Sequence, residues 1–219
     1  MNIAIIGAGN VGRALGTSFT AAGHTVTYAA RDTAGAREAA DSIGARAAAT
    51  PADAARDADV VVLAIPYETA GRDVAAQLAP VAWGRVVVHA TNPLTADYGD
   101  LATRNGPSAA ENFAAWMPGA RLVKAFNTLF ASVQANPATH GTIVDGLYAT
   151  DDREAGTTVA ALLQSVGFRP IYVGPLARAR ELEAVAFLNI QLQMQAQGDW
   201  RTAITFVGAP TGATQETAG

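Results

Sequence analysis

The sequence predicts an α/β fold, with a doubly wound, mainly parallel sheet and a small C-terminal α/β extension that ends in a long helix. Short apolar, often β-branched runs recur along the 219-residue chain, which is typical of strands covered on both faces. Segments with helical periodicity alternate with these runs, as βαβ units require. Half of the residues are apolar and only 16% are charged, so the chain is able to bury a large core.

The first thirty residues contain the most informative motif. Residues 2–6 form an apolar run, residues 7–12 read Gly-Ala-Gly-Asn-Val-Gly, and a helical pattern follows from Arg13 to Ala22. Between a strand and a helix, G-x-G-x-x-G is the fingerprint of a Rossmann-type dinucleotide site, although a glycine-rich turn without a ligand is the alternative. Gly7 allows the tight turn, Gly9 lets the backbone approach a pyrophosphate, and Gly12 lets the helix lie close to the strand. The helix N-terminus then faces the phosphates.

The end of the second expected strand, residues 25–30, indicates which dinucleotide binds. Folds of this type that prefer NAD usually carry an acidic residue there, whereas this strand is followed by Arg31. A guanidinium suits a 2′-phosphate because its planar fork binds phosphate oxygens in two bonds. The prediction is therefore NADP(H). A shift of one residue would instead place Asp32 near the ribose, and Arg37 is either a second positive charge at the site or a solvated helix residue.

Composition and charge exclude several classes of protein. The net charge of −4 and the lack of a basic run argue against a nucleic-acid surface. Cysteine is absent, which excludes disulfides, thiol catalysis and cysteine-ligated metals. We expect no signal peptide, because the chain begins with a strand, and no membrane helix, because no segment approaches about 20 apolar residues. The expectation is a cytoplasmic protein with neither a nucleic-acid nor a membrane partner.

The remaining elements are expected in a regular order. Thr50 and Pro51 suit the start of a helix, and Ser108 with Glu111 forms a capping box. Further strands are expected at residues 45–48, 60–65, 85–90, 121–126, 142–149 and 169–173. Further helices are expected at residues 34–43, 51–57, 67–79, 108–116, 151–166 and 174–197, with a loop at 97–107 and a polar connection at 134–141. We divide the chain into a Rossmann NADP(H)-binding domain (residues 1–130), a smaller C-terminal portion (131–203) and a flexible tail (204–219).

Polar and apolar turn residues stand at the carboxyl ends of the expected strands, the edge where ligands of open α/β sheets bind. Ile65, Pro66 and Tyr67 either wall the nicotinamide end or are ordinary strand-end packing. Hydroxyl and amide side chains follow the next two strands, in Thr91, Asn92 and Pro93 and then in Asn127 and Thr128.

Two titratable residues lie inside these strands. His89 is either a proton donor or, as is commoner near a buried strand end, a packing residue. Lys124 is interpreted as a polar strand residue that reaches solvent rather than as a catalytic lysine.

Three motifs carry a resemblance to a known family: Ala90-Thr91-Asn92-Pro93-Leu94, Val123-Lys124-Ala125-Phe126-Asn127-Thr128 and Gly174-Pro175-Leu176. From Met1 to about Trp200 the chain resembles the NADPH-dependent reductases of the deazaflavin coenzyme F420. It also resembles the cytosolic domains of the STEAP metalloreductases, which use a flavin. The resemblance implies that the fold binds NADP(H), and that the ring of a second cofactor stacks near the nicotinamide, between the strand-end loops and a C-terminal portion that completes its site.

The resemblance also implies roles for particular residues. It assigns Gly7, Gly9, Asn10, Val11 and Gly12 to the pyrophosphate, Arg31 to the 2′-phosphate, Ile65 and Pro66 to the ribose and nicotinamide, and Asn92, Pro93, Asn127 and Thr128 to the reacting rings. Two residues depart from the family pattern. Ala30 stands where many relatives have a serine, which removes one hydroxyl donor to the 2′-phosphate. Asn127 stands where archaeal deazaflavin reductases have a histidine, which changes a residue near the acceptor.

Hydride transfer between two stacked rings needs orientation more than acid–base chemistry. Asn92, Asn127 and Thr128 are therefore predicted to position the rings. The sequence shows no serine–histidine–acid set, no paired carboxylates at a strand end and no metal-binding cluster. The predicted function is an NADPH-dependent reductase of coenzyme F420 or a flavin. The alternatives are an imine or small-acid reductase of the pyrroline-carboxylate-reductase or β-hydroxyacid-dehydrogenase group, and a non-catalytic NADP(H)-binding sensor.

The last expected helix carries a stripe at helical spacing, which is interpreted most simply as packing. Its members are Leu182, Val185, Ala186, Leu188, Asn189 and Leu192. The length of this stripe motivates the hypothesis of a homodimer. Met194 and Trp200 line a second-ring pocket, a dimer seam or, more simply, the core.

Overall fold

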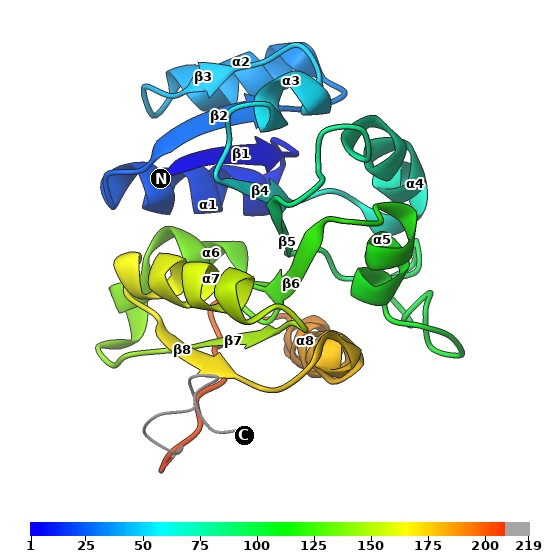
Figure 1. Ribbon diagram of the computed structural model, residues 1–219. Helices are drawn as coiled ribbons and strands as arrows, with labels where there is room; N and C mark the ends of the chain where they lie inside the picture. Colours follow the sequence, from blue (N-terminus) through cyan, green and yellow to red (C-terminus); the bar gives the residue numbers. More distant parts are fainter. Residues whose placement is uncertain (209–219) are drawn as a thin grey trace.

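The computed structural model describes residues 1–208 and contains one eight-stranded sheet, in the order β3-β2-β1-β4-β5-β6-β7-β8 (Figure 1). Neighbouring strands are parallel except for β6 and β7, which are antiparallel. The predicted Rossmann-type α/β fold is therefore confirmed. The strands are β1 (Asn2–Ile6), β2 (Thr25–Ala29), β3 (Arg46–Ala47), β4 (Val60–Leu63), β5 (Val86–His89), β6 (Arg121–Ala125), β7 (Asp145–Ala149) and β8 (Arg169–Tyr172).

Helices cover both faces of this sheet, because its strand residues are apolar on both sides. Ile3 and Ile5 belong to one buried cluster, whereas Ala4 and Ile6, which alternate with them, belong to the other. The first cluster lies under α1 (Asn10–Ala21), α2 (Thr33–Asp41), α6 (Ala131–Ala135) and α7 (Arg153–Ser165). The second lies under α3 (Pro51–Ala55), α4 (Tyr67–Leu78) and α5 (Ala109–Trp116).

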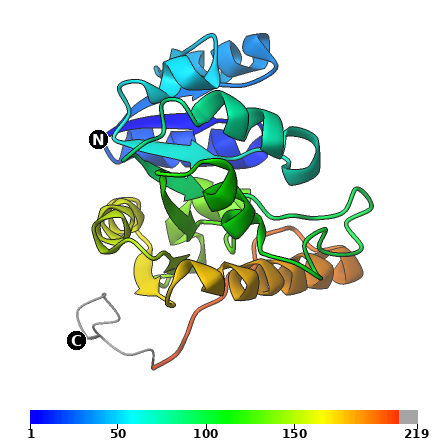
Figure 2. The ribbon, with the colours of Figure 1, turned by 45° about the vertical axis from the view of Figure 1, so that its right-hand side comes forward.

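The last helix, α8 (Ala179–Ala196), packs across β7 and against α5, and Figure 2 shows it lengthwise. Its N-terminal part buries Leu182 against Leu147 and Ile171 of β7 and β8. Its C-terminal part lies beside the loop that precedes α5, where the Gln191 amide donates a hydrogen bond to the Tyr98 carbonyl over 2.7 Å. The segment after β8 therefore returns to the part of the sheet formed by β5 and β6.

The topology makes one edge of the sheet the natural place for a ligand. Strand β1 lies between β2 and β4, so the order of the strands reverses at β1. In open α/β sheets a crevice forms at such a reversal, at the carboxyl ends of the strands. The carboxyl ends of the central strands are aligned: Ile6 pairs with Leu63, Leu63 with His89, and His89 with Lys124. The turns after β1, β4, β5 and β6 therefore lie side by side.

Three expectations about local structure were wrong. The polar connection at residues 134–141 instead contains the end of α6 and a short 3-10 helix at Pro137–His140. The long helix begins at Ala179, after a 3-10 turn at Leu176–Arg178, and not at Gly174. The stripe on α8 is not wholly packed, because Leu188 is 70% and Leu192 is 53% exposed. Glu183 and Gln193 are buried instead, since their long side chains find polar partners inside the fold.

The expected flexible tail, residues 204–219, falls partly outside the described residues. Within the described part, the backbone N–H of Phe206 donates to the Asp145 carboxylate over 2.7 Å. The guanidinium of Arg169 donates to the Phe206 carbonyl over 2.9 Å. Phe206 is thus attached to β7 and β8. Residues 209–219 lie outside the described residues, and the division of the chain at residues 130 and 203 stays a prediction.

Candidate functional site

The turn after β1 has a geometry that requires glycine at two positions. Gly7 has a φ of +115°, and a Cβ atom there would lie 2.1 Å from the Ala64 carbonyl oxygen. A Cβ atom at Gly12 would lie 2.0 Å from the Gly7 carbonyl oxygen. Gly9 differs, because no atom lies within 4 Å of the place where its Cβ would stand. Space beside Gly9 is therefore open to a ligand that approaches the backbone.

Helix α1 begins directly after this open glycine. Gly9 is its N-cap and provides no side-chain cap, and the first turn contains no acidic residue. The N-terminal N–H groups are therefore left to bind an anion, as the positive end of the helix dipole favours. The Tyr28 hydroxyl donates to the Gly12 carbonyl over 3.0 Å, which fixes the start of α1 on β2, and burial raises the pKa of Tyr28 to about 12.

A cavity of about 540 Å³ extends from the glycine turn along the ends of β2 and β4. Its walls include Gly7, Gly9, Arg13, Arg31 and Pro66. The exposed Arg31 side chain crosses this cavity toward α4, where its guanidinium lies 3.5 Å from the Thr69 carbonyl. The position after β2 that the sequence assigned to the 2′-phosphate thus presents a guanidinium to an open cavity.

Asp32 and Arg37, the other charged residues considered near the ribose, differ in their positions relative to this cavity. Asp32 also reaches the cavity, but its carboxylate is the N-cap of α2 and accepts from the N–H groups of Ala34 and Gly35, each over 3.1 Å. Arg37 is exposed on α2 and does not line the cavity. The register therefore leaves the Arg31 guanidinium with one long contact, to the Thr69 carbonyl at 3.5 Å, whereas two backbone N–H groups engage the Asp32 carboxylate.

A second cavity, of about 500 Å³, lies at the ends of β1, β4, β5 and β6. It shares Gly9, Ala64, Ile65 and Pro66 with the first cavity, so the two meet at the glycine turn. Nine of the residues predicted to bind the cofactors line it: Gly9, Asn10, Val11, Ile65, Pro66, Thr91, Asn92, Asn127 and Thr128. Phe130, Ala186, Ile190 and Trp200 also line it, as does the polar Asn189 of α8. The lining therefore combines apolar groups with a few side-chain amides.

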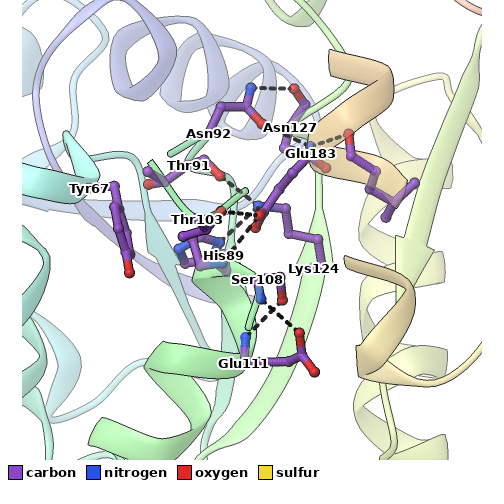
Figure 3. Close-up of polar contacts among 12 residues, drawn as sticks. Tyr67, His89, Thr91, Asn92, Thr103, Ser108, Glu111, Lys124, Asn127 and Glu183 are labelled. Atoms are coloured by element: carbon purple, nitrogen blue, oxygen red, sulfur yellow. Dashed lines mark hydrogen bonds and ion pairs between the residues drawn. The ribbon is translucent and has the colours of Figure 1, made fainter. Parts of the chain in front are cut away.

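Asn92 and Asn127 form an interlocked pair at this cavity (Figure 3). The Asn127 side-chain amide donates to the Asn92 Oδ1 atom over 3.0 Å, and the Asn92 amide donates to the Asn127 carbonyl over 2.9 Å. Asn127 also donates to the Leu182 carbonyl of α8 over 3.0 Å. Its own Oδ1 atom is buried without a hydrogen-bond partner among residues 1–208. The pair therefore joins the turns after β5 and β6 to α8.

The turn that presents Asn127 is conformationally strained. Phe126, the preceding residue, is fully buried with a φ of +64°, a left-handed conformation that side chains other than glycine rarely adopt. The ring packs edge-on against Phe19 and Phe168, and the Gln134 amide donates to the Phe126 and Leu129 carbonyls. Packing and these two hydrogen bonds hold the turn in place, so Asn127 and Thr128 reach the cavity in a fixed position.

Tyr67 and Pro93 do not line either of these cavities. The Tyr67 ring stacks on Trp116 with its centroid 6.0 Å away, and its hydroxyl accepts a hydrogen bond from Asn112 over 2.8 Å. Figure 3 shows Tyr67 apart from the asparagine pair. Pro93 is buried, and its carbonyl accepts from the Ala102 N–H. Tyr67 therefore packs on α5, and Pro93 holds the loop that precedes α5.

Lys124 and His89 lie behind the cavity in the protein interior, and the expectation that Lys124 reaches solvent was wrong. Both side chains are fully buried, and the Lys124 ammonium pairs with Glu183 over 2.9 Å. Burial, and secondly the charge of Lys124, hold the pKa of His89 well below its ordinary value. His89 is therefore neutral and lines neither cavity, which identifies it as a packing residue and not as a proton donor.

The described residues lack the features of a metal site and of a membrane-spanning helix. No group of three or more His, Asp or Glu side chains in residues 1–208 is arranged to hold a metal ion. No helix in the same range combines the length and apolar character needed to cross a bilayer. Cytoplasmic location stays a prediction.

The chain is similar in sequence to known NADP-dependent reductases. Residues 2–93 match the family model described as NADP oxidoreductase, coenzyme F420-dependent. The F420-dependent NADP reductase of Methanothermobacter thermautotrophicus is 34% identical over 212 residues, which cover 89% of this chain and 90% of that protein. The chain belongs to the family of F420-dependent NADP reductases.

Further relatives of this reductase extend the comparison. The rat metalloreductase STEAP3 is 30% identical over 187 residues, which cover 84% of this chain and 36% of that protein. A solved structure of an assigned F420-dependent NADP reductase from Arthrobacter sp. FB24 matches with a TM-score of 0.84 and 27% identity, over 94% of this chain and all of that one. A reductive aminase from Aspergillus terreus shares the fold, with a TM-score of 0.68 and 24% identity over 90% of this chain and 62% of that one. The reductase is thus an NADP oxidoreductase, and both family resemblances are confirmed.

Sequence reasoning missed Arg13 and the Lys124–Glu183 ion pair. Arg13 lines the first cavity and donates to the Ala8 carbonyl over 3.0 Å, and its position directly after the third glycine was the available signal. The Lys124–Glu183 pair joins residues 59 positions apart, and no local pattern indicates it. Trp200 lines the second cavity and packs edge-on against Phe130, although core packing was the simpler expectation.

Proposed function

We propose that this reductase transfers a hydride between NADP(H) and the deazaflavin ring of coenzyme F420. The observation that carries the proposal is the pair of cavities that meet at Gly9 and Pro66. One has the glycine turn, a helix N-terminus and a guanidinium, which suit the phosphates and ribose of a dinucleotide. The other is largely apolar with a few amide groups, which suits a flat ring system.

The residues of the first cavity fit NADP(H). The side of Gly9 is open, so a pyrophosphate is able to approach the N–H groups that begin α1. Arg31 offers its guanidinium to a 2′-phosphate, and Ala30 offers no hydroxyl beside it. Arg13 adds positive charge near the turn, although Glu38 lies 3.3 Å from its guanidinium and offsets part of that charge. Arg31 is therefore the main determinant of the choice between NADPH and NADH.

The residues of the second cavity orient the rings. The two substrates would supply the redox chemistry: NADPH gives up a hydride, which is one proton with two electrons, and the deazaflavin takes up that hydride and one proton from water. Asn92 and Asn127 hold each other and so present amide groups in fixed positions. Thr128 adds a hydroxyl, and Phe130 and Trp200 exclude water from one side. The side chains in this cavity act by orientation, and proton exchange is left to solvent.

A flavin is the second candidate acceptor. The apolar lining of the second cavity suits a deazaflavin and an isoalloxazine ring alike, and the rat STEAP3 match covers 84% of this chain. The imine-reductase reading has weaker support, because the similarity to the Aspergillus terreus protein is one of fold. A non-catalytic sensor would require NADPH binding without turnover.

Stopped-flow absorbance tests the proposal. Purified protein is mixed with NADPH and with F420, FAD, FMN or a cyclic imine separately, and NADH serves as the control donor. Rapid bleaching of F420 with NADPH but not NADH is the expected result. Reduction of a flavin alone would change the acceptor, reduction of a cyclic imine alone would favour the imine-reductase reading, and binding of NADPH without turnover on any of them would contradict the enzymatic proposal.

We also propose that two copies associate through α8. The exposed side chains Leu188 and Leu192 lie one turn apart, and Tyr98 on the neighbouring loop is 53% exposed. Covering such apolar surface stabilises an assembly by roughly 25 cal/mol for each Å² removed from water. The mass of a single chain at micromolar concentration in light scattering would contradict this proposal.

A further inference from the structure

A buried ion pair lies directly behind the second cavity. The side chains of Lys124 on β6 and Glu183 on α8 are 0% and 1% exposed, and their charged atoms are 2.9 Å apart. His89 of β5 completes the cluster, with its Nδ1 atom 3.0 Å from the lysine ammonium (Figure 3). The described cavities do not reach these three side chains, so a direct role in catalysis does not explain them.

Every donor of the ammonium group has a partner. Lys124 donates to Glu183 Oε1, to His89 Nδ1 and to the Thr91 carbonyl, the last over 2.6 Å. The ion pair with Glu183 makes this nitrogen an ammonium group, which has donors only, so the Nδ1 atom of His89 accepts and the ring proton is assigned to Nε2. Burial lowers the pKa of Lys124, and the Glu183 carboxylate opposes that shift. The Nε2 atom of His89 is buried without a hydrogen-bond partner among residues 1–208.

Glu183 links three further segments to this cation. Its second oxygen accepts from the Ala109 N–H at the start of α5 over 3.1 Å and faces the Thr103 hydroxyl at 3.4 Å. One carboxylate therefore joins α8 to α5, to β6 and to the loop that precedes α5. Any movement of α8 along the sheet would break several of these bonds together.

Two connections join the ion pair to the asparagine pair, and each runs through a neighbouring residue in the chain. Lys124 holds the Thr91 carbonyl, and Thr91 precedes Asn92. Glu183 follows Leu182, whose carbonyl accepts from the Asn127 amide. The Thr91 hydroxyl also donates to the Ile65 carbonyl over 2.9 Å. The charges thus fix the backbone on both sides of the asparagine pair and next to the place where the two cavities meet.

We propose that the Lys124–Glu183 ion pair, with His89, is a positioning device for hydride transfer: it sets the place of Asn92, Asn127 and α8 at the second cavity. This inference rests on the proposed function. Stability alone is a weak reason to bury such a pair, because apolar residues of similar volume often replace one at no cost. A fixed ring geometry is a stronger reason, because small displacements of reacting groups lower rates strongly.

A double variant tests whether the ion pair positions the reacting groups or only stabilises the fold. Lys124→Met with Glu183→Gln removes both charges, keeps similar volumes and leaves no unpaired buried charge. We expect a melting temperature within a few degrees of the wild type and an unchanged affinity for 2′,5′-ADP, which binds at the Arg31 end. We expect single-turnover hydride transfer from NADPH to F420 to fall by about 10- to 100-fold. The fluorescence of bound NADPH should also change, because the nicotinamide surroundings shift.

The matched control is the ion pair at the opposite end of the same strand. Arg121 of β6 bonds Asp152 at the start of α7 over 2.6 Å, remote from both cavities. Arg121→Met with Asp152→Asn should leave hydride transfer and NADPH fluorescence at wild-type values. Equal behaviour of the two double variants in both measurements would overturn the inference.

Two further outcomes keep the inference separate from the proposed function and from folding. If the wild type does not reduce F420, the proposed function fails, and the fluorescence of bound NADPH still decides the inference. If the Lys124→Met/Glu183→Gln variant does not fold, Glu183→Asp takes its place, because it keeps the charge and withdraws the carboxylate by one methylene. A several-fold lower kcat with an unchanged NADPH dissociation constant supports the inference, and wild-type kinetics in Glu183→Asp overturns it.

Discussion

The glycine turn after β1 and the asparagine pair after β5 and β6 form neighbouring parts of one sheet edge, but different interactions hold them in place. The glycine turn depends on main-chain geometry, since Gly7 and Gly12 leave no room for a Cβ atom. The asparagine pair depends on side chains from distant segments, including the fully buried Lys124 and Glu183.

This difference follows from what each part contacts. A phosphate chain binds to N–H groups, which every residue provides, so a short local motif is sufficient. A ring pocket needs walls on several sides, so β4, β5, β6 and α8 all contribute to the second cavity. Substitutions should therefore act locally in the first part and through long-range contacts in the second.

The largest expected effect is on the long-range part. Lys124→Met alone leaves Glu183 buried without its cation, which should lower the free energy of unfolding by about 3–5 kcal/mol. Arg121→Met on the same strand breaks a partly exposed pair and should cost about 1 kcal/mol or less. Urea unfolding of both variants measures the difference. Similar losses would mean that burial does not distinguish the two ion pairs.

In the glycine turn, substitution of one glycine should mainly lower stability, and substitution of another should mainly weaken NADPH binding. Gly12→Ala places a Cβ atom 2.0 Å from the Gly7 carbonyl oxygen, and we expect a loss of stability of about 1–3 kcal/mol. Gly9→Ala meets no atom within 4 Å, so it should cost about 1 kcal/mol or less as a weaker N-cap. The same variant should nevertheless weaken NADPH binding strongly. Thermal unfolding and calorimetric titration check the pair, and normal NADPH affinity in Gly9→Ala would place the pyrophosphate elsewhere.

The choice of nucleotide should depend on one side chain. Arg31→Ala removes a guanidinium from the first cavity, and the affinity for NADPH should fall by about 10- to 100-fold, as for the loss of one charged hydrogen-bonded contact. The affinity for NADH should change little. Arg37→Ala should leave both affinities within about twofold, because Arg37 does not line the cavity. A preserved preference for NADPH in Arg31→Ala would contradict this assignment.

The smallest expected effect concerns pH and the partly exposed ion pair. Hydrogen bonds from Arg121 lower the pKa of Asp152 to about 2, from an ordinary value of 3.8. A carboxyl group whose pKa is lowered in the folded state stabilises the fold when the pH is above the ordinary pKa of that group. This contribution is lost as the pH falls from about 4 to 2. Solvent screening limits it to about 1 kcal/mol. Asp152→Asn keeps a helix cap and should flatten this part of the unfolding profile; an unchanged profile would assign the acid sensitivity to another carboxylate.

The sequence by itself determined the elements whose signal is local. The strand, glycine turn and helix of residues 2–21, the N-cap at Thr50 and the capping box of Ser108 and Glu111 all occur where their residues predicted them. The parallel order of the sheet followed from alternating strands and helices. Nine of the residues singled out for the site line the second cavity, because strand ends of a parallel sheet share one edge.

Tertiary structure alone decided the contacts between distant segments. Only the folded chain shows that Lys124 is buried, because its partner Glu183 comes from a helix 59 residues later. It also decides that Arg31 presents its guanidinium to the first cavity while Asp32 is engaged as the cap of α2, and that Tyr67 stacks on Trp116. Periodicity specifies which side of a helix or strand is apolar, but it carries no information about which distant charge will neutralise a buried one. Pairing of buried charges depends on three-dimensional proximity, and in this reductase that proximity is set by the return of α8 to the ends of β5 and β6.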